Sequence, residues 1–116
     1  MLSVKLCKIH IKSVNAITTP SLKKKFAEFV ELKKNHPREP FGSSDKPYSK
    51  SGNFSGYSHA HLTFDMVVNY KIDGQCLYLY GVFSHDDLGI GQPANKNKQK
   101  SMGEKFDNQV FERMIK

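Results

Sequence analysis

Three of the five histidines in this chain, His59, His61 and His85, lie within residues 57–87. His59 and His61 are separated by one residue, so on a β-strand both rings would point to the same face of the sheet. Histidine is a common metal ligand, and it titrates near neutral pH, which lets it accept or donate a proton in catalysis. These histidines are therefore candidate metal ligands, candidate acid–base catalysts, or ordinary polar residues at strand ends.

A metal site would combine these histidines with a carboxylate, and the nearest carboxylates in the sequence are those of Asp65, Asp86 and Asp87. Sets of histidine and carboxylate ligands hold zinc and iron in many proteins. Two histidines at a spacing of two residues also occur without any metal. The spacing alone therefore does not identify a metal site.

Cleavage of RNA is an acid–base reaction that this set of residues also fits. It needs a base for the 2′-hydroxyl, an acid for the departing 5′-oxygen and a cation beside the phosphate. The chain has 18 Lys and Arg against 11 Asp and Glu, a formal charge of +7. A surface of this charge attracts polyanions, and nucleic acid is the first candidate.

The composition fits one folded domain over residues 1–116. Hydrophobic residues make up 38% of the chain, and eight Phe and five Tyr argue against disorder. The sequence contains neither a secretory signal nor an apolar run long enough to span a membrane, so we expect a cytoplasmic protein. Cys7 and Cys76 lie in apolar patterns without a CxxC motif, and we expect both to be reduced packing residues.

The first half of the chain predicts a strand, a helix and a long loop. Apolar residues alternate through residues 3–12, which indicates a strand with His10 on its polar side. A Thr-Pro pair starts a helix over residues 19–35, with Lys34 on its solvent face. Residues 36–56 are rich in Pro, Gly and Ser and predict a loop whose length is typical of functional or mobile segments.

Three strands are expected next, at residues 57–63, 66–72 and 75–84, with Asp73-Gly74 as a two-residue hairpin turn. One face of this sheet suits packing on a helix and carries Val68, Tyr70, Ile72, Leu77, Leu79 and Phe83. The other face is more polar and aromatic, with Val67, Asn69, Lys71, Tyr78 and Tyr80.

The chain is expected to end with a loop at residues 86–96 and a helix at residues 97–114, whose apolar face includes Met102, Phe106, Val110, Phe111 and Met114. The order of elements predicts an α+β fold. Its small curved sheet would be mainly antiparallel, with about four strands, the N-terminal helix packed on it and a C-terminal helix. Threaded through the hairpin, His61 and His85 would lie at adjacent strand ends.

The stretch "AHLTFDMVVNYKIDGQCLYLYGVFSHDDLG" resembles the RelE/ParE superfamily of bacterial toxins from toxin–antitoxin pairs, and is most similar to the YafQ branch. The shared pattern is a His near a strand end, an Asp four residues on, a Tyr-Lys pair before a polar hairpin, and "H-x-x-L" after a strand. It is matched here by His61, Asp65, Tyr70-Lys71 and His85.

Features similar to the YafO branch lie mostly outside that stretch. They are "FG" followed by an acidic residue in the long loop (Asp45), the "HxHL" of residues 59–62, and the pattern of the last helix. Together the two sets of features span about two-thirds of the chain. This resemblance also implies a RelE-like fold.

The resemblance implies an mRNA interferase, an endoribonuclease that cleaves mRNA in the ribosomal A site and so inhibits translation. Such toxins need no metal or other cofactor, and an antitoxin partner silences them; here we expect a small acidic protein. His61, Asp65 and His85 match the YafQ-like catalytic positions. His85 is the candidate general acid, and His61 or Asp65 acts as base or orients the other. His59 matches the additional histidine of the YafO-like pair and is a candidate phosphate ligand.

The sequence departs from the YafQ-like pattern at three places. Met66 stands where the pattern has an aromatic residue, Gly89 stands at its terminal aromatic position, and the histidine of the long loop is absent. The cationic and RNA-binding roles are therefore assigned to lysines: Lys46, Lys50, Lys71, Lys96 and Lys98. Three alternatives stay open: a ParE-like inhibitor of DNA gyrase, a non-catalytic RNA- or ribosome-binding module, and a metal protein.

Overall fold

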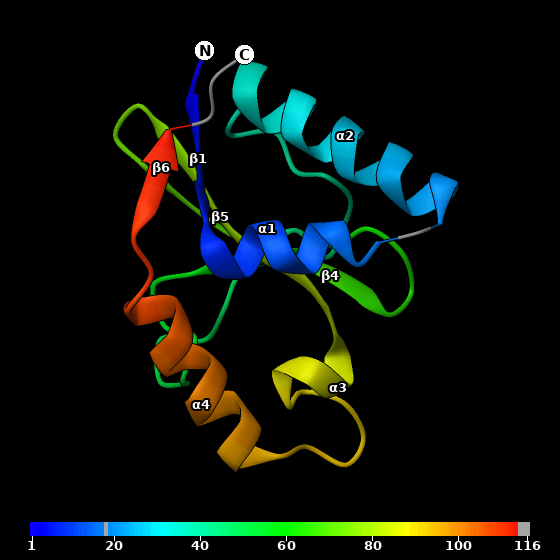
Figure 1. The fold of residues 1–116 in the computed structure, drawn as a ribbon, viewed down its shortest axis with the longest axis vertical. Helices are drawn as coiled ribbons and strands as arrows, with labels where there is room; N and C mark the ends of the chain where they lie inside the picture. The colour runs from blue at the N-terminus through cyan, green and yellow to red at the C-terminus, as the bar shows by residue number, and fades with distance from the viewer. Residues whose placement is uncertain (18, 114–116) are drawn as a thin grey trace.

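The computed structural model describes residues 1–17 and 19–113, and it has the α+β fold predicted from the sequence (Figure 1). Its elements are β1 (Ser3–Cys7), α1 (Lys8–Asn15), α2 (Pro20–Asn35), β2 (Lys46–Pro47), β3 (Ser58–His61), β4 (Met66–Asp73), β5 (Cys76–Ser84), α3 (His85–Leu88), α4 (Lys96–Asp107) and β6 (Phe111–Arg113). Within the described residues the strands form one sheet in the order β2-β3-β4-β5-β1-β6. Only β1 and β5 pair in parallel. The short edge strands β2 and β6 were not among the four expected.

The N-terminal strand is shorter than its alternating pattern predicted. It ends at Cys7, where the strict alternation is interrupted, and α1 begins at the next residue. His10, Val14 and Ile17 follow at spacings of four and three and face the core, which suits a helix. His10 is therefore buried in a helix and not on the polar side of a strand. Burial lowers its pKa to about 4, so the ring is neutral.

The helix α2 starts at the expected Thr-Pro pair and packs its apolar side on the sheet. Phe29 is fully buried, and its ring centroid lies 5.2 Å from that of Tyr70 on β4. The prediction that Lys34 faces solvent was wrong, because this residue is buried. The backbone N–H of Leu2 donates to the Lys34 carbonyl oxygen over 3.0 Å, which brings the last turn of α2 against the start of the sheet.

The β4–β5 hairpin turns one residue later than predicted. Asp73 pairs with Cys76, so the two turn residues are Gly74 and Gln75. Gly74 has a positive φ of 60°, which glycine adopts without strain. The change moves every cross-strand partner near the turn by two positions, and because side chains alternate with a period of two, each residue keeps its face there.

A β-bulge at Tyr80–Gly81 then reverses the alternation along β5. Beyond it, Val82 packs in the core on the α2 side and Phe83 packs on the opposite side, so the predicted face of Phe83 was wrong. Gly81 has a φ of 139°, and a Cβ at this position would lie 2.4 Å from the Phe83 ring. Both facts favour glycine at the bulge.

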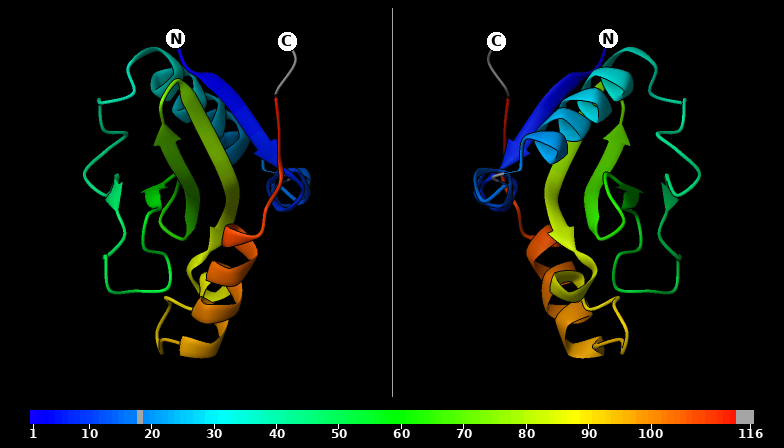
Figure 2. Two further views of the ribbon diagram at one scale, coloured as in Figure 1. Left: turned by 90° about the vertical axis from the view of Figure 1, so that its left-hand side faces the viewer. Right: turned by 90° about the vertical axis from the view of Figure 1, so that its right-hand side faces the viewer.

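The aromatic face of the sheet is covered rather than open. The long loop runs along the β2 edge of the sheet, away from α1 (Figure 2), and its aromatic side chains form a second core on this face with residues of α3 and α4. The buried members of this core are Phe54, Tyr57, Val67, Tyr80, Leu88 and Phe106. The helix α4 approaches the loop closely at Gly103, where a Cβ would lie 2.5 Å from the carbonyl oxygen of Asn53.

The segment predicted as a last helix contains a helix and a strand. The helix α4 ends at Asp107, and β6 pairs with β1, so residues 111–113 extend the sheet. Val110 lies in the connection and is 82% exposed, whereas Phe111 packs against the second core. The loop expected at 86–96 begins with the short helix α3, and Met114 lies outside the described residues.

Both cysteines are free thiols, as the sequence predicted. Cys7 is buried and its Sγ donates a hydrogen bond to the carbonyl oxygen of Leu79 over 3.5 Å; burial raises the pKa of this thiol. In the described part of the chain no helix combines the length and apolar character needed to cross a membrane.

Candidate active site

His61, Asp65 and His85 form one continuous chain of hydrogen bonds. His61 is the last residue of β3, and its Nε2 lies 3.0 Å from Nε2 of His85, the first residue of α3. Nδ1 of His85 lies 2.9 Å from Oδ1 of Asp65, and the same oxygen accepts the backbone N–H of His85 over 3.3 Å. The fold therefore places His61 and Asp65, from the end of β3 and the turn after it, beside His85 at the start of α3.

The geometry gives the two rings different protonation properties. The carboxylate of Asp65 fixes Nδ1–H of His85 as a donor, so Nε2 of His85 faces His61. The contact between the two Nε2 atoms needs one N–H and one lone pair, and the rings therefore share one proton at this contact. Nδ1 of His85 lies beside the Asp65 carboxylate. Burial, and then repulsion from His85, lower the pKa of His61. His85 is thus suited to donate a proton and His61 to accept one.

The carboxylate in this chain is exposed to solvent and remains ionised. Hydrogen bonds from the side chain and the backbone of His85 lower the pKa of Asp65 below its ordinary value. Its side chain is 58% exposed, and that of His85 is 26% exposed. The site is therefore open at the surface, and a large substrate can reach it.

The connection between β3 and β4 places Asp65 opposite His85. Leu62 is buried, and its backbone N–H donates to the carbonyl oxygen of Met66 over 2.8 Å. The Thr63 side chain accepts the backbone N–H of Met66 over 3.2 Å. These contacts close a tight turn, which leaves Phe64 and Asp65 at its surface. On the other side, Ser84 caps α3 by accepting the N–H of Asp87, and this orients the helix that begins with His85.

His59 is on the same strand as His61 but outside the hydrogen-bonded chain. Its ring centroid lies 6.3 Å from that of His61, and it stacks on the Tyr48 ring at a centroid distance of 4.2 Å. The Tyr48 hydroxyl in turn donates to the side-chain oxygen of the buried Asn69. Burial, followed by repulsion from His61, lowers the pKa of His59. His59 is therefore a second neutral ring beside the site.

Tyr48 and Ser44 support the site and were missed from the sequence. Ser44 accepts the backbone N–H of His61 with its Oγ over 3.2 Å. Both residues belong to the long loop, where no periodicity identifies positions that contact the sheet. For Tyr48, the only signal in the sequence was an aromatic residue in a loop rich in Ser and Pro.

Two of the predicted lysines lie beside the histidines. Lys46 on β2 is the cross-strand partner of His59, and its charge contributes to the lowered pKa of that ring. Nζ of Lys98 lies 3.3 Å from the carbonyl oxygen of Asp86, the residue after His85. Both side chains are in exposed residues, so their charges are available to an anionic ligand.

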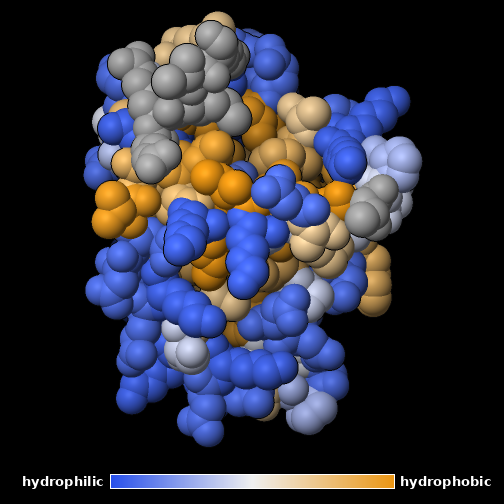
Figure 3. Space-filling view, in the orientation of Figure 1, coloured by the Kyte–Doolittle hydropathy of each residue, from blue (hydrophilic) through white to orange (hydrophobic). Residues whose placement is uncertain are grey.

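The other three lysines are not all gathered at the site. Lys71 lies five residues along β4 from Met66, roughly 16 Å from the histidine end of the strand, given 3.3 Å per residue. Lys50 is exposed in the long loop and Lys96 is exposed at the start of α4. Figure 3 shows that the surface over α4 is mostly hydrophilic, whereas apolar side chains gather near α1 and β1.

The side chain of Asp45, the acidic residue of the "FG" feature, is buried in a cluster of structural contacts, close enough to His59 for its charge to act on the pKa of that ring. Its carboxylate lies 2.5 Å from Nζ of Lys33 on α2 and accepts the hydroxyl of Tyr70 on β4. It also accepts the backbone N–H of Phe41 over 2.8 Å. The side chains of Lys33 and Asp45 are 4% and 2% exposed. This cluster ties the long loop to α2 and to the sheet.

No group of three or more His, Cys, Asp or Glu side chains is arranged to hold a metal ion within residues 1–17 and 19–113. The two imidazole nitrogens that would be ligands instead face each other across a hydrogen bond. What this arrangement offers chemically is a proton acceptor and a proton donor side by side.

No family model matches the sequence. No curated protein matches it significantly. Solved structures do match. The YoeB/ParE toxin from Agrobacterium tumefaciens superposes with a TM-score of 0.63 at 17% identity, over 72% of this chain and 99% of the toxin. The E. coli DinJ–YafQ complex contains a chain that superposes with a TM-score of 0.63 at 20% identity, over 76% of this chain and 98% of that one.

A third match is the YoeB–YefM complex from Staphylococcus aureus, with a TM-score of 0.62 at 11% identity over 73% of this chain and 98% of the matched chain. This chain has the RelE/ParE toxin fold. The part of the chain that superposes corresponds to nearly the whole length of each toxin. The RelE/ParE-type fold that the sequence resemblance implied is thus confirmed.

Proposed function

We propose that this protein is an endoribonuclease toxin, an mRNA interferase that cleaves mRNA in the ribosomal A site and inhibits translation. The observation that carries this proposal is the hydrogen-bonded chain of Asp65, His85 and His61 on a RelE/ParE-type fold. The formal charge of +7 suits an RNA substrate.

In this mechanism His61 is the base and His85 is the acid. His61 removes the proton of a 2′-hydroxyl, and the resulting oxygen attacks the adjacent phosphorus. The bond to the 5′-oxygen breaks, and that oxygen takes the proton of the His85 imidazolium. The products are a 2′,3′-cyclic phosphate and a free 5′-hydroxyl. His61 gains one proton while His85 loses one, so the two imidazoles carry both proton transfers.

Base and acid act on oxygens on opposite sides of the phosphorus during in-line attack. Two rings in direct contact cannot do this, so the phosphate must enter between His61 and His85 and replace their shared hydrogen bond. Asp65 keeps His85 in the correct tautomer during this change and stabilises its charge. Catalytic contacts often reach their working geometry only in the substrate complex.

Lys46 and Lys98 are the proposed cations for the phosphate charge, because Lys46 pairs with His59 across β2 and β3 and Lys98 contacts the backbone of Asp86, next to His85. His59 supports the same function as a phosphate ligand from β3. Lys50, Lys71 and Lys96 are proposed to contact the RNA farther from the cleaved bond.

An antitoxin is the proposed protein partner. YafQ was crystallised in a complex with DinJ, and YoeB in a complex with YefM. By analogy, a small acidic protein would bind this basic chain in the cytoplasm and block its access to the ribosome.

Substitution of the two histidines tests the proposed function. We expect His61→Ala and His85→Ala each to slow cleavage of a reporter mRNA in a translating extract by about 10²–10⁴-fold, the usual contribution of general acid–base groups. Primer extension would locate the cuts, and circular dichroism would check folding. His36→Ala is the matched control, because His36 is exposed on another part of the chain.

The same assay separates the proposal from its rivals. Cleavage should continue in excess EDTA, since both proton transfers use imidazoles. A folded His61→Ala/His85→Ala protein that still cuts mRNA would disprove the assignment. A parent protein that spares mRNA but inhibits DNA supercoiling would indicate a gyrase inhibitor. Binding of RNA without cleavage would indicate a non-catalytic module.

A further inference from the structure

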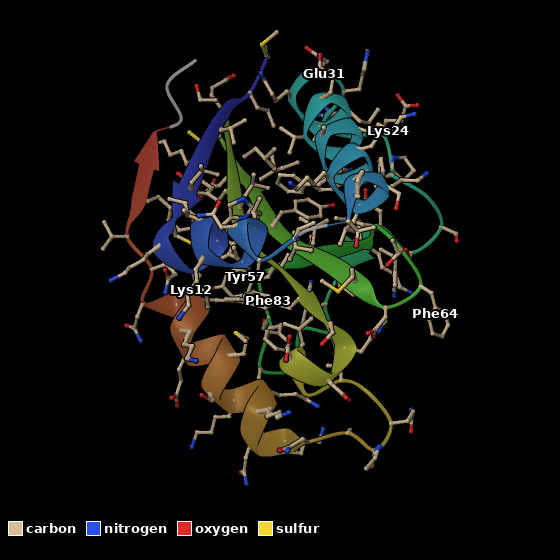
Figure 4. The ribbon with its side chains drawn as sticks, turned by 45° about the vertical axis from the view of Figure 1, so that its right-hand side comes forward. Lys12, Lys24, Glu31, Tyr57, Phe64 and Phe83 are labelled. Carbon is tan, nitrogen blue, oxygen red and sulfur yellow. The ribbon has the colours of Figure 1, made fainter. Side chains whose placement is uncertain are left out.

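Phe64 is the most exposed large apolar side chain in the described part of the molecule, at 95%. It lies at the surface of the β3–β4 turn and points away from the body of the protein (Figure 4). Single exposed apolar side chains are common on protein surfaces, so it is the position of this ring, together with its exposure, that points to a ligand.

The turn that carries Phe64 is held on both sides. Leu62 is anchored in the core, and its N–H donates to Met66 across the turn. On the other side, the carboxylate of Asp65 accepts two hydrogen bonds from His85. The exposure of Phe64 therefore follows from the shape of a closed turn.

Phe64 is also adjacent to the proposed reaction centre. The next residue, Asp65, contacts His85 directly, and His85 contacts His61. A ligand group on the Phe64 ring would therefore lie beside a substrate whose phosphate reaches the two histidines.

The surroundings of the ring fit a nucleobase better than a protein surface. Its sequence neighbours in the turn, Thr63 and Asp65, are polar and exposed. The other exposed large apolar side chains in the described residues belong to other segments: Met1, Ile11 and Val110. Protein docking generally uses a contiguous apolar patch, whereas a single planar ring suffices to stack with a base.

We propose that Phe64 stacks on a base of the RNA next to the cleaved bond and so positions the strand over His61 and His85. This inference rests on the proposed function and adds a substrate-positioning residue to it. Stacking on an aromatic side chain tolerates every base, so Phe64 contributes to affinity and placement more than to sequence preference.

The absence of tryptophan from the chain allows a direct test. Phe64→Trp introduces the only indole, whose fluorescence reports stacking. The ligand is a single-stranded RNA oligonucleotide with 2′-O-methyl groups, which cannot be cleaved because it lacks the attacking hydroxyl. Its binding is measured independently by the anisotropy of a label on the RNA. Val110→Trp is the matched control, because Val110 is also highly exposed but lies between α4 and β6.

We expect RNA to quench the fluorescence of Phe64→Trp strongly and that of Val110→Trp only weakly. We also expect Phe64→Ala and Phe64→Leu to bind this RNA about tenfold more weakly than the parent, whereas Phe64→Trp keeps its affinity. Leu retains apolar bulk but not the flat ring, so the pair of variants separates stacking from burial. Unchanged melting temperatures would show that the variants are folded.

Equal affinity of Phe64→Ala and the parent would overturn the proposal, and so would equal quenching at positions 64 and 110. Failure of the proposed function gives a different result, namely a parent protein that does not cleave mRNA or one whose cleavage survives loss of His61 and His85. A parent that cleaves mRNA by way of these histidines, together with a Phe64→Ala variant that cleaves at the same rate, would exclude the role of Phe64 alone.

Discussion

At the scale of residues, the main feature is that two similar side chains are made chemically different by their neighbours. His85 has a carboxylate on its Nδ1, whereas the buried Nδ1 of His61 has no hydrogen-bond partner among the described residues. Of the two rings, only that of His85 therefore has a carboxylate beside it to hold an Nδ1 proton. This asymmetry is what the proposed division into acid and base requires.

The titration of His61 tests this asymmetry. The pKa of His61 is lowered by burial and by repulsion from His85, so this ring should charge only below the ordinary histidine value of 6.5. In His85→Gln the repulsion is removed while most of the burial remains, and the pKa should rise part of the way back. Proton NMR of the ring C–H signals measures both values.

His36 provides the internal control for that titration, since its signal should behave identically in the two proteins. An unchanged or lower pKa of His61 in His85→Gln would contradict the electrostatic coupling. Because a lowered pKa leaves His61 neutral and able to accept a proton above that value, the cleavage rate should fall on the acidic side only below about pH 6.5.

At the scale of elements, a buried ion pair is one of the contacts that hold the long loop on the fold. Asp45 holds Phe41 of the loop, Lys33 of α2 and Tyr70 of β4. The next residue toward the N-terminus, Ser44, accepts the backbone N–H of His61. The cluster therefore links the fold of the loop to the position of a candidate catalytic residue.

Removal of this carboxylate should be strongly destabilising. Asp45→Ala leaves the Lys33 ammonium buried without its partner, and we expect a loss of about 3–5 kcal/mol in the free energy of unfolding. Urea denaturation measures the loss. The double variant Lys33→Met/Asp45→Leu removes the unpaired charge and should recover part of the loss, while the Phe41 N–H and the Tyr70 hydroxyl still lack their acceptor. A loss below about 1 kcal/mol in Asp45→Ala would show that the pair does not hold the loop.

At the scale of the whole molecule, the basic charge is not used uniformly. Lys46 and Lys98 lie beside the histidines, while Lys71 is near the opposite end of β4. A phosphate backbone that reaches His61 and His85 would thus meet Lys46 and Lys98 close to the cleaved bond.

The salt dependence of RNA binding should reflect this distribution. The logarithm of the binding constant falls linearly with that of the salt concentration, with a slope of about −0.7 for each phosphate contact to a single strand. We expect Lys46→Ala and Lys98→Ala each to make the slope shallower by about this amount. Lys24→Ala, on the exposed side of α2 and outside the proposed RNA contacts, is the control and should change it less. Equal effects of all three would mean that the RNA binds the whole basic surface without preference for the site.

The sequence alone determined those features of the fold that depend on patterns within short segments. The Thr-Pro start of α2, the central strands, the α+β class and the similarity to RelE/ParE toxins all follow from patterns within short segments. The histidines were candidates from residue type and spacing, and the set of His61, Asp65 and His85 followed from the resemblance to the YafQ-like pattern. The closeness of His61 and His85 at neighbouring strand ends was expected from the pairing through the hairpin.

Only the tertiary structure decided features that depend on contacts between distant segments. The bulge at Tyr80–Gly81 moved Phe83 to the second core, and the pairing of β6 with β1 ended a helix that the local pattern would have continued. The burial of His10 and Lys34 likewise depends on neighbouring elements that no local period encodes. The same reason applies to the site: spacing placed its histidines near each other, but the Asp65 contact that distinguishes His85 from His61 exists only once the turn and the sheet have folded.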